Sequence, residues 1–296
     1  MFGKASKYAF ANAVLAVIEG KMLTQAQVDQ MYVAGSLKEL VRMFSDTIYA
    51  QYFEDGADIA EIAEKESIRA KLELYEILPP DDHFVFDMYY KRYDYNNLKI
   101  LLKSHFLNKP VNASELSAVG CISPQELMAY FEEERFDDLP FLFSFSELEA
   151  EFQKSKEMRL VDSVLDRAYY REFLDVIYRK NDDFLVDYLR QQIDLKNFLV
   201  LVRCSRTNLN PENYFLDGGY IDLYTLAGYA GEPPDSLLTA PDFAGYRLLL
   251  RHGVEALEKK GSFSELETTI KNHAILHLRD VRDFYFTIKP FVAVSY

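Results

Sequence analysis

The stretch DHFVFDMYYKRYDYNNLKIL, residues 82–101, recurs 100 residues later as DDFLVDYLRQQIDLKNFLVL, residues 182–201. Six of these twenty positions are identical without a gap, whereas chance would give about one, and a repeat of this length indicates related supersecondary units. The identical pairs are Asp82/Asp182, Phe84/Phe184, Asp87/Asp187, Asp94/Asp194, Asn97/Asn197 and Leu101/Leu201. A feature shared by both copies is therefore expected to be architectural before it is catalytic.

The apolar positions of the two copies also agree, and their spacing is helical. They follow one another at steps of three, seven, three and four residues, which places them on one face of an α-helix. The matching pairs are Val85/Leu185, Met88/Tyr188, Tyr95/Leu195, Leu98/Phe198 and Leu102/Val202.

The composition is that of an ordered globular protein with an acidic surface. The chain has 296 residues, 49% of them apolar, and a net charge of −14. This length is enough for a large core or for two or three smaller ones. The negative charge argues against a broad nucleic-acid surface, because phosphate binding needs clustered Lys and Arg. It favours neutral or basic partners.

The sequence gives no sign of a membrane span or of a disulfide framework. No run approaches the roughly 18–20 uncharged apolar residues that a span requires. The stretch 8–18 contains Asn12 and lacks a cleavage pattern, so it is interpreted as an internal helix. Cys121 and Cys204 are the only cysteines, and two isolated thiols make a cytoplasmic location the default.

Helical patterns dominate the whole chain, and we predict an all-α fold. Start signals support several helices: Thr24 to Gln27 and Ser264 to Glu267 fit capping boxes, and Ser123 before Pro124 fits an N-cap. The predicted helices are 8–18, 36–47, 58–78, 82–106, 124–134, 146–179, 182–207, 246–259 and 264–287.

Three helical units are predicted along the chain. Breaks near 109–120, 208–219 and 228–241 place unit one at 1–118, unit two at 119–222 and a more divergent unit three at 223–296. In unit three the Asp-x-x-Asn helix that closes the first two has no counterpart. We therefore expect this unit to differ from the others or to be incomplete or truncated at the C-terminus.

The most enzyme-like motif is Asp81-Asp82-x-x-x-x-Asp87. Carboxylates at this spacing can hold Mg²⁺ on a diphosphate, as in all-α prenyl transferases. The alternative is helix capping, since Asp is a good N-cap after Pro79-Pro80. The spacing differs in the second copy, which starts at Asp182-Asp183, and the downstream Arg-Arg-Gly partner is absent, so capping is favoured.

A second possible metal site is His273-x-x-x-His277 with Asp280 nearby. Two imidazoles four residues apart share one helix face and could form half of a metal site. The intervening Ala-Ile-Leu lacks the Glu of a metalloprotease helix. Ordinary surface or partly buried histidines are therefore the favoured interpretation.

A polar stripe runs along both repeat helices. One interpretation is a surface presented to a partner. The other is that Asp and Asn hydrogen-bond neighbouring elements and fix their register. The candidate residues for partner binding or register are Asp87, Lys91, Asp94, Asn97, Asp187, Asp194 and Asn197. No Walker loop, nucleophile elbow or local cysteine-protease signature accompanies them, and no catalytic, cofactor or metal residue is assigned.

Several segments together resemble a known family, the C subunits of V/A-type ATPases, which are similar to the d subunit of eukaryotic vacuolar ATPases. The resemblance covers nearly the whole chain, and the combination is more specific than any one motif. The matching segments are YAFANAVLA at 8–16, KMLT at 21–24, SLKEL at 36–40 through TIY at 47–49, DYNNLK at 94–99, LDRAYY at 165–170 and DLKNF at 194–198.

This resemblance implies three similar helical units around a pseudo-threefold axis, forming a funnel. It implies a non-catalytic central-stalk rotor subunit, without cofactors, that lies on the cytoplasmic side of the membrane. Its expected partners are the axle subunits D and F and the membrane proteolipid ring. It would transmit torque for proton or sodium transport coupled to ATP hydrolysis or synthesis.

Two departures from the family pattern qualify this expectation. The family usually continues with a third helix resembling E-I-K-N-x-R after the segment matching Phe291 to Tyr296, so the resemblance also leads us to expect a truncated or divergent unit three. The first helix also carries Ala13-Val14-Leu15 where the family often has basic residues. The alternatives left open are a generic α-helical repeat scaffold and a Mg-dependent prenyl-transferase-like enzyme.

Overall fold

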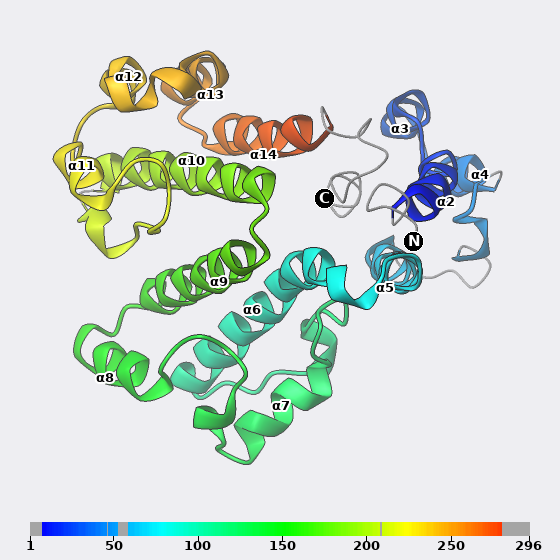
Figure 1. Ribbon diagram of the computed structural model, residues 1–296, viewed down its shortest axis with the longest axis horizontal. Coiled ribbons are helices and arrows are strands. Elements are labelled where there is room, and N and C mark those ends of the chain that lie inside the picture. The colour runs from blue at the N-terminus through cyan, green and yellow to red at the C-terminus, as the bar shows by residue number, and fades with distance from the viewer. Residues whose placement is uncertain (1–7, 46, 53–58, 208, 280–296) are drawn as a thin grey trace. The chain divides into compact units, whose positions relative to one another are not determined.

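The computed structural model describes residues 8–45, 47–52, 59–207 and 209–279 (Figure 1). Within these ranges the chain forms α-helices connected by turns and short 3-10 segments, and none of it forms a strand. The predicted all-α fold is therefore confirmed.

The helices of the first part of the chain include the first copy of the repeat. Their bounds are α2 Ala9–Glu19, α3 Gln25–Tyr32, α4 Leu37–Phe44, α5 Ile59–Ile77 and α6 Phe84–Leu107. The 24-residue α6 carries the first Asp-x-x-Asn motif.

The second part of the chain contains the second copy, which lies on the 25-residue α10. Its helices are α7 Pro124–Glu132, α8 Phe145–Ser155, α9 Arg159–Lys180, α10 Asp183–Thr207, α11 Leu223–Gly228, α12 Pro234–Thr239, α13 Arg247–Lys260 and α14 Ser264–Arg279.

Several predicted caps are present. Thr24 accepts from the backbone N–H of Gln27, whose side chain accepts in return, so the capping box at α3 is confirmed. Ser123 caps α7 with Pro124 in the first turn. Such side-chain acceptors satisfy backbone donors that the first turn of a helix leaves unpaired.

Some predictions about local structure were wrong. The helix predicted over 146–179 is two helices, because Lys156 adopts a left-handed conformation with φ of 57° and ends α8. Ser264 is the first helical residue of α14 and not its cap. Of the short helices, α3 was indicated only by its capping box at Thr24, and α12 was not predicted. The six residues of α12 show too little periodicity to indicate a helix.

The described chain divides into two compact units. One contains residues 8–93 and 117–122, and the other contains 94–116 and 123–279, each apart from the gaps given above. The boundaries 1–118, 119–222 and 223–296 and their pseudo-threefold arrangement stay a prediction. The expected lack of a closing helix in unit three concerns residues 288–296, which lie outside the described range.

Hydrophobic clusters hold the described helices of the larger unit together. One surrounds α10, which contacts α14, while α13 packs on α14 and α12. There Phe198 and Phe243 meet edge to face with ring centroids 5.1 Å apart. Such an aromatic pair adds about 0.5–1.5 kcal/mol beyond its buried area.

The second cluster joins the later part of α6 to α8 and α9. Its aromatic rings stack closely. The ring centroids of Phe106 and Phe152 are 4.4 Å apart, and those of Phe136 and Phe145 are 4.0 Å apart. Part of the chain's large aromatic content is thus used for helix packing.

Candidate functional site

The polar stripe of α10 holds the loop that follows it. Asn197 is fully buried and pairs with the backbone of Leu216 in both directions. Its Nδ2 donates to the Leu216 carbonyl at 2.8 Å, and its Oδ1 accepts from the Leu216 N–H at 2.8 Å. One amide side chain thus satisfies both backbone groups of a buried loop residue, which would otherwise be costly to bury.

Asp194, one turn earlier on α10, holds the next part of the same loop. Its carboxylate accepts from the backbone N–H groups of Tyr220 at 3.2 Å and Ile221 at 3.1 Å, and from the Tyr246 hydroxyl at 2.9 Å. Burial raises the pKa of Asp194, while these three donors pull the pKa down. The carboxylate thus joins α10 to the loop and to Tyr246, which directly precedes α13.

Arg190 makes a third set of contacts between α10 and the loop, and we call Arg190, Asp194 and Asn197 together the anchor of the loop. Its guanidinium donates twice to the Gly219 carbonyl, at 2.9 and 3.3 Å, and lies over the Tyr220 ring at 4.3 Å. The Tyr220 hydroxyl donates to Asp187 at 2.5 Å. Three turns of one helix therefore hold Leu216, Gly219, Tyr220 and Ile221.

The loop can approach α10 this closely because it contains two consecutive glycines. A Cβ on Gly219 would lie 2.2 Å from Asp194 Oδ1, and one on Gly218 would lie 2.3 Å from Leu174 Cδ1. Gly218 also has φ of 96°, which residues with side chains rarely adopt. Both positions require glycine for the anchor to form.

The anchored loop presents an exposed aromatic and acidic surface, formed by Asp217, Tyr220, Asp222, Leu223 and Tyr224. We call this the 217–224 surface. Tyr224 is 90% exposed, Tyr220 is 52% exposed and Leu223 is 39% exposed. Asp222 caps α11 by accepting from Thr225, and this bond holds the pKa of Asp222 below its usual value. The arrangement can present a fixed surface but contains no nucleophile paired with a base.

In the first copy, the corresponding Asp and Asn are equally inaccessible. Asp94 is 0% exposed and Asn97 is 1% exposed, and their counterparts in the second copy are also buried. A buried side chain cannot meet a partner without rearrangement. We therefore propose that Asp94, Asn97 and their two counterparts fix register and do not themselves contact a partner.

The remaining stripe candidates are Asp87, Lys91 and Asp187, which are partly exposed. Asp87 accepts from the Tyr75 hydroxyl at 2.5 Å, which links α6 to α5. Asp187 accepts from Gln191 at 2.9 Å besides its bond from Tyr220. Their role in partner binding stays a prediction.

Sequence reasoning found Asp187, Asp194 and Asn197 through the repeat but missed Arg190, Tyr220 and Tyr224. Arg190 has no identical counterpart in the first copy, where Tyr90 stands. The two tyrosines lie beyond the repeated stretch. Their one sequence signal is their position after a Gly pair, which by itself indicates only a turn.

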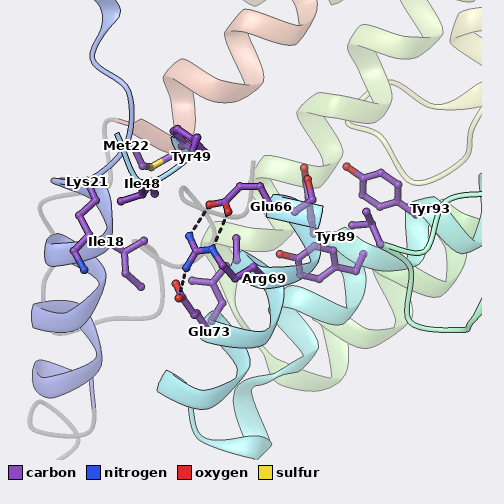
Figure 2. Close-up of a pocket in the computed structure, with 15 residues that line it drawn as sticks. Ile18, Lys21, Met22, Ile48, Tyr49, Glu66, Arg69, Glu73, Tyr89 and Tyr93 are labelled. Carbon is purple, nitrogen blue, oxygen red and sulfur yellow. Dashed lines mark hydrogen bonds and ion pairs between the residues drawn. The ribbon is translucent and has the colours of Figure 1, made fainter. Parts of the chain in front are cut away.

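The smaller unit contains an open pocket of about 330 Å³ between α5, α6 and the end of α2. Figure 2 shows Arg69 in its wall between two carboxylates, Glu66 and Glu73, both within ion-pair distance. The Tyr52 hydroxyl donates to Glu66 at 2.8 Å, and the bond to Glu66 raises the pKa of Arg69. The charges of Arg69 and its two partners are thus engaged within the wall.

The alternative interpretation of Asp81, Asp82 and Asp87 as Mg²⁺ ligands finds no support in the structure. Among the residues that the structure describes, no three Asp, Glu, His or Cys side chains form a group that could hold a metal. Buried Asp82 accepts from the Tyr8 hydroxyl at 3.2 Å. In the second copy, Asp182 accepts from the Leu185 N–H at 3.0 Å, as a cap would.

Two other sequence interpretations concern histidine and cysteine. The His277 side chain and Asp280 fall outside the described residues, so the pair His273 and His277 stays untested. Cys121 is exposed, Cys204 is buried, and no disulfide joins them. Among the described helices, none combines the length and the apolar content that a membrane span needs.

Comparison with known proteins identifies the chain's relatives. The family model for the ATP synthase (C/AC39) subunit matches residues 11–296. A relative named as the C subunit of an A-type ATP synthase, from Desulfurococcus sp. (strain SY), is 24% identical, over 95% of this chain and 80% of its own length. Proteins of the same name from Thermococcus gammatolerans and Methanocaldococcus jannaschii are 22% and 24% identical, over 95% and 89% of this chain and 79% and 72% of their own lengths.

Proposed function

The chain belongs to the ATP synthase (C/AC39) subunit family, and from this premise we propose that it is a non-catalytic rotor subunit of the central stalk. In this role it links the axle subunits D and F to the membrane proteolipid ring. It transmits torque between ATP hydrolysis or synthesis and the transport of protons or sodium ions. It binds peripherally on the cytoplasmic side.

The observation that carries this proposal is the extent of the family match. A model that matches residues 11–296 covers both copies of the repeat and both described units. The relatives also align over most of their own length.

The packing supports a mechanical role on physical grounds. A subunit that transmits torque must resist deformation between its two contact surfaces. The loop after α10 is held at Leu216 by Asn197, at Gly219 by Arg190, and at Tyr220 and Ile221 by Asp194. Buried networks with satisfied donors and acceptors make a structure rigid and specify one arrangement.

The charge of the chain supports a basic partner. A net charge of −14 attracts a positively charged axle foot and speeds association through electrostatic complementarity. Binding to such a partner should weaken as ionic strength rises, because salt screens exposed charges.

Reconstitution of the complex with and without this chain tests the proposal. We expect the complex lacking the chain to keep ATP hydrolysis in its catalytic part but to lose ATP-driven ion transport. Restoring the full-length chain should restore transport. Unchanged transport in its absence would contradict the rotor role.

A pull-down against the axle subunits D and F, and separately against the detergent-solubilised ring, tests the partners. Binding to both at low salt supports a coupler between them. Binding to neither favours the generic helical scaffold. Axle binding that does not change between low and high salt would refute the electrostatic part of the proposal.

A further inference from the structure

The 217–224 surface is the most exposed aromatic feature of the larger unit, and it lies within a strongly acidic stretch. Residues 207–246 contain six Asp or Glu and no Lys, Arg or His. Asp217, Asp222 and Tyr224 are all exposed, and Asp187 accepts a hydrogen bond from the Tyr220 hydroxyl. The positive charge of Arg190 balances one of the three negative charges on Asp187, Asp217 and Asp222. The net charge of the surface therefore remains negative.

This surface is specific to the second copy. Aligned on the helix caps Ser123 and Asp222, the first copy has Cys121, Pro124 and Gln125 where the second has Tyr220, Leu223 and Tyr224. The anchor residues Asp and Asn are shared by both copies, whereas the exposed aromatic residues are not. A role in holding the fold together accounts for the shared Asp and Asn, but it does not account for the exposed tyrosines Tyr220 and Tyr224.

The loop is also preorganised. Its backbone is bonded to α10 at four residues, so the tyrosine and leucine side chains start from a fixed base. Binding to a fixed surface loses less conformational entropy than binding to a mobile loop. Tyrosine adds large contact area at low entropic cost and is enriched at the energetic centres of interfaces.

We propose that the 217–224 surface is a docking site for a Lys- or Arg-rich face of another protein subunit in the same assembly. Carboxylates at Asp187, Asp217 and Asp222 attract the cations, and the exposed ring of Tyr224 stacks against one of them. Arg190 over Tyr220 shows the same geometry within the chain, at 4.3 Å from the ring centroid. The inference rests on the proposed function, because it takes membership of the complex as given.

Other occupants fit the chemistry less well. A second copy of this chain would bring another net charge of −14. Nucleic acid and anionic lipid would also meet three carboxylates with like charge, which costs binding energy. These occupants are outcomes that the experiment can identify.

The test places the photo-crosslinking residue p-benzoylphenylalanine at position 224 of the full chain in the assembled ATP synthase complex. The same residue at position 32 is the matched control, because Tyr32 is 84% exposed but lies in the other unit. We expect crosslinking from position 224, and not from position 32, to a segment of another subunit with clustered Lys or Arg.

A binding measurement supplies the second readout. Tyr224→Ala should weaken association of the chain with the crosslinked subunit by roughly 5-fold to 30-fold, the effect of one cation–π contact in a partly dry interface. Tyr32→Ala should leave it unchanged. Because Tyr224 is 90% exposed, its truncation leaves the fold intact.

The contradicting outcomes are distinct. No crosslink, a crosslink to lipid, to a second copy or to an acidic segment, or the same products from both positions, would overturn the docking site while leaving the rotor role intact. Equal affinity of Tyr224→Ala and the unsubstituted chain would overturn it as well. Absence of the chain from the purified complex would instead refute the proposed function, and with it the docking site.

Discussion

Replacing Asn197 by Ala gives the sharpest test of the register role. The substitution removes the acceptor of the Leu216 N–H and the donor to the Leu216 carbonyl, both at 2.8 Å, from a residue that is 0% exposed. Leu216 is itself 4% exposed, so water does not replace these bonds freely.

The magnitude follows from the number of groups left unpaired. A buried donor or acceptor without a partner costs about 1–3 kcal/mol, so two of them cost about 2–6 kcal/mol. Water that enters the volume vacated by the amide lowers this cost. We therefore expect the opening free energy of the loop to fall by about 3 kcal/mol, which is more than a hundredfold in its opening equilibrium constant.

Amide hydrogen exchange measured on peptides covering 211–222 is the appropriate assay. It reports local opening and does not require the whole chain to unfold in one step. Exchange in these peptides should accelerate by roughly a hundredfold. Lys196→Ala is the control, because Lys196 is an exposed neighbour on the same helix and its loss should leave the loop protected.

The result that would refute the reasoning is unchanged exchange in 211–222 together with lost binding to another subunit. Asn197 would then act through a partner contact and not through the loop. Asn197→Asp gives an intermediate case. It retains an acceptor for the Leu216 N–H but directs a second acceptor at the Leu216 carbonyl, so we expect partial acceleration.

Three further predictions follow from the same contacts. Gly219→Ala should destabilise the loop by several kcal/mol in hydrogen exchange, since the new Cβ would lie 2.2 Å from Asp194; exchange like that of the parent chain would contradict this. The pKa of Asp194 is higher in the folded state than in the unfolded state, where it lies near 4. Protonated Asp194 therefore adds to the free energy of unfolding below the unfolded pKa, and this added stability is lost as pH rises through the folded pKa. The unfolding free energy of the parent chain relative to Asp194→Asn should therefore fall across this window in urea titrations, and a rise would show that the sign is wrong. Removing the half-exposed pair of Lys103 and Asp162, 2.6 Å apart, should cost less than about 1 kcal/mol in a double-mutant cycle, whereas a larger coupling would indicate a network.

The long helices were predictable because their apolar spacing repeats over many turns. The helix predicted over 182–207 is observed as Asp183–Thr207, and the one over 82–106 as Phe84–Leu107. The break between α8 and α9 was not predictable. It occurs at Lys156, whose left-handed conformation is rare for a residue with a side chain, and neither Gly nor Pro marks it.

The site was predictable only in part. The repeat singled out Asp194 and Asn197 but gave no indication of their partners. Those partners lie 19–27 residues further along the chain, in a loop without periodic spacing, and one more lies at Tyr246, 52 residues away. Pairing at such separations depends on how α10, the loop and α13 pack, and that information is not local.

Comparison of the two copies of the repeat distinguishes buried residues that fix the fold from exposed residues that differ between the copies. None of the twelve side chains identical in the two copies is exposed, and Asp94, Asn97, Asp194 and Asn197 are almost completely buried. Identity between copies thus follows burial, because a buried polar group tolerates few replacements that keep its bonds. Exposed positions carry no such constraint, so a large aromatic side chain such as Tyr224 that occurs in one copy only needs another cause. That cause is best sought in a partner, and the search for partner-binding residues in this chain should therefore begin where the copies differ.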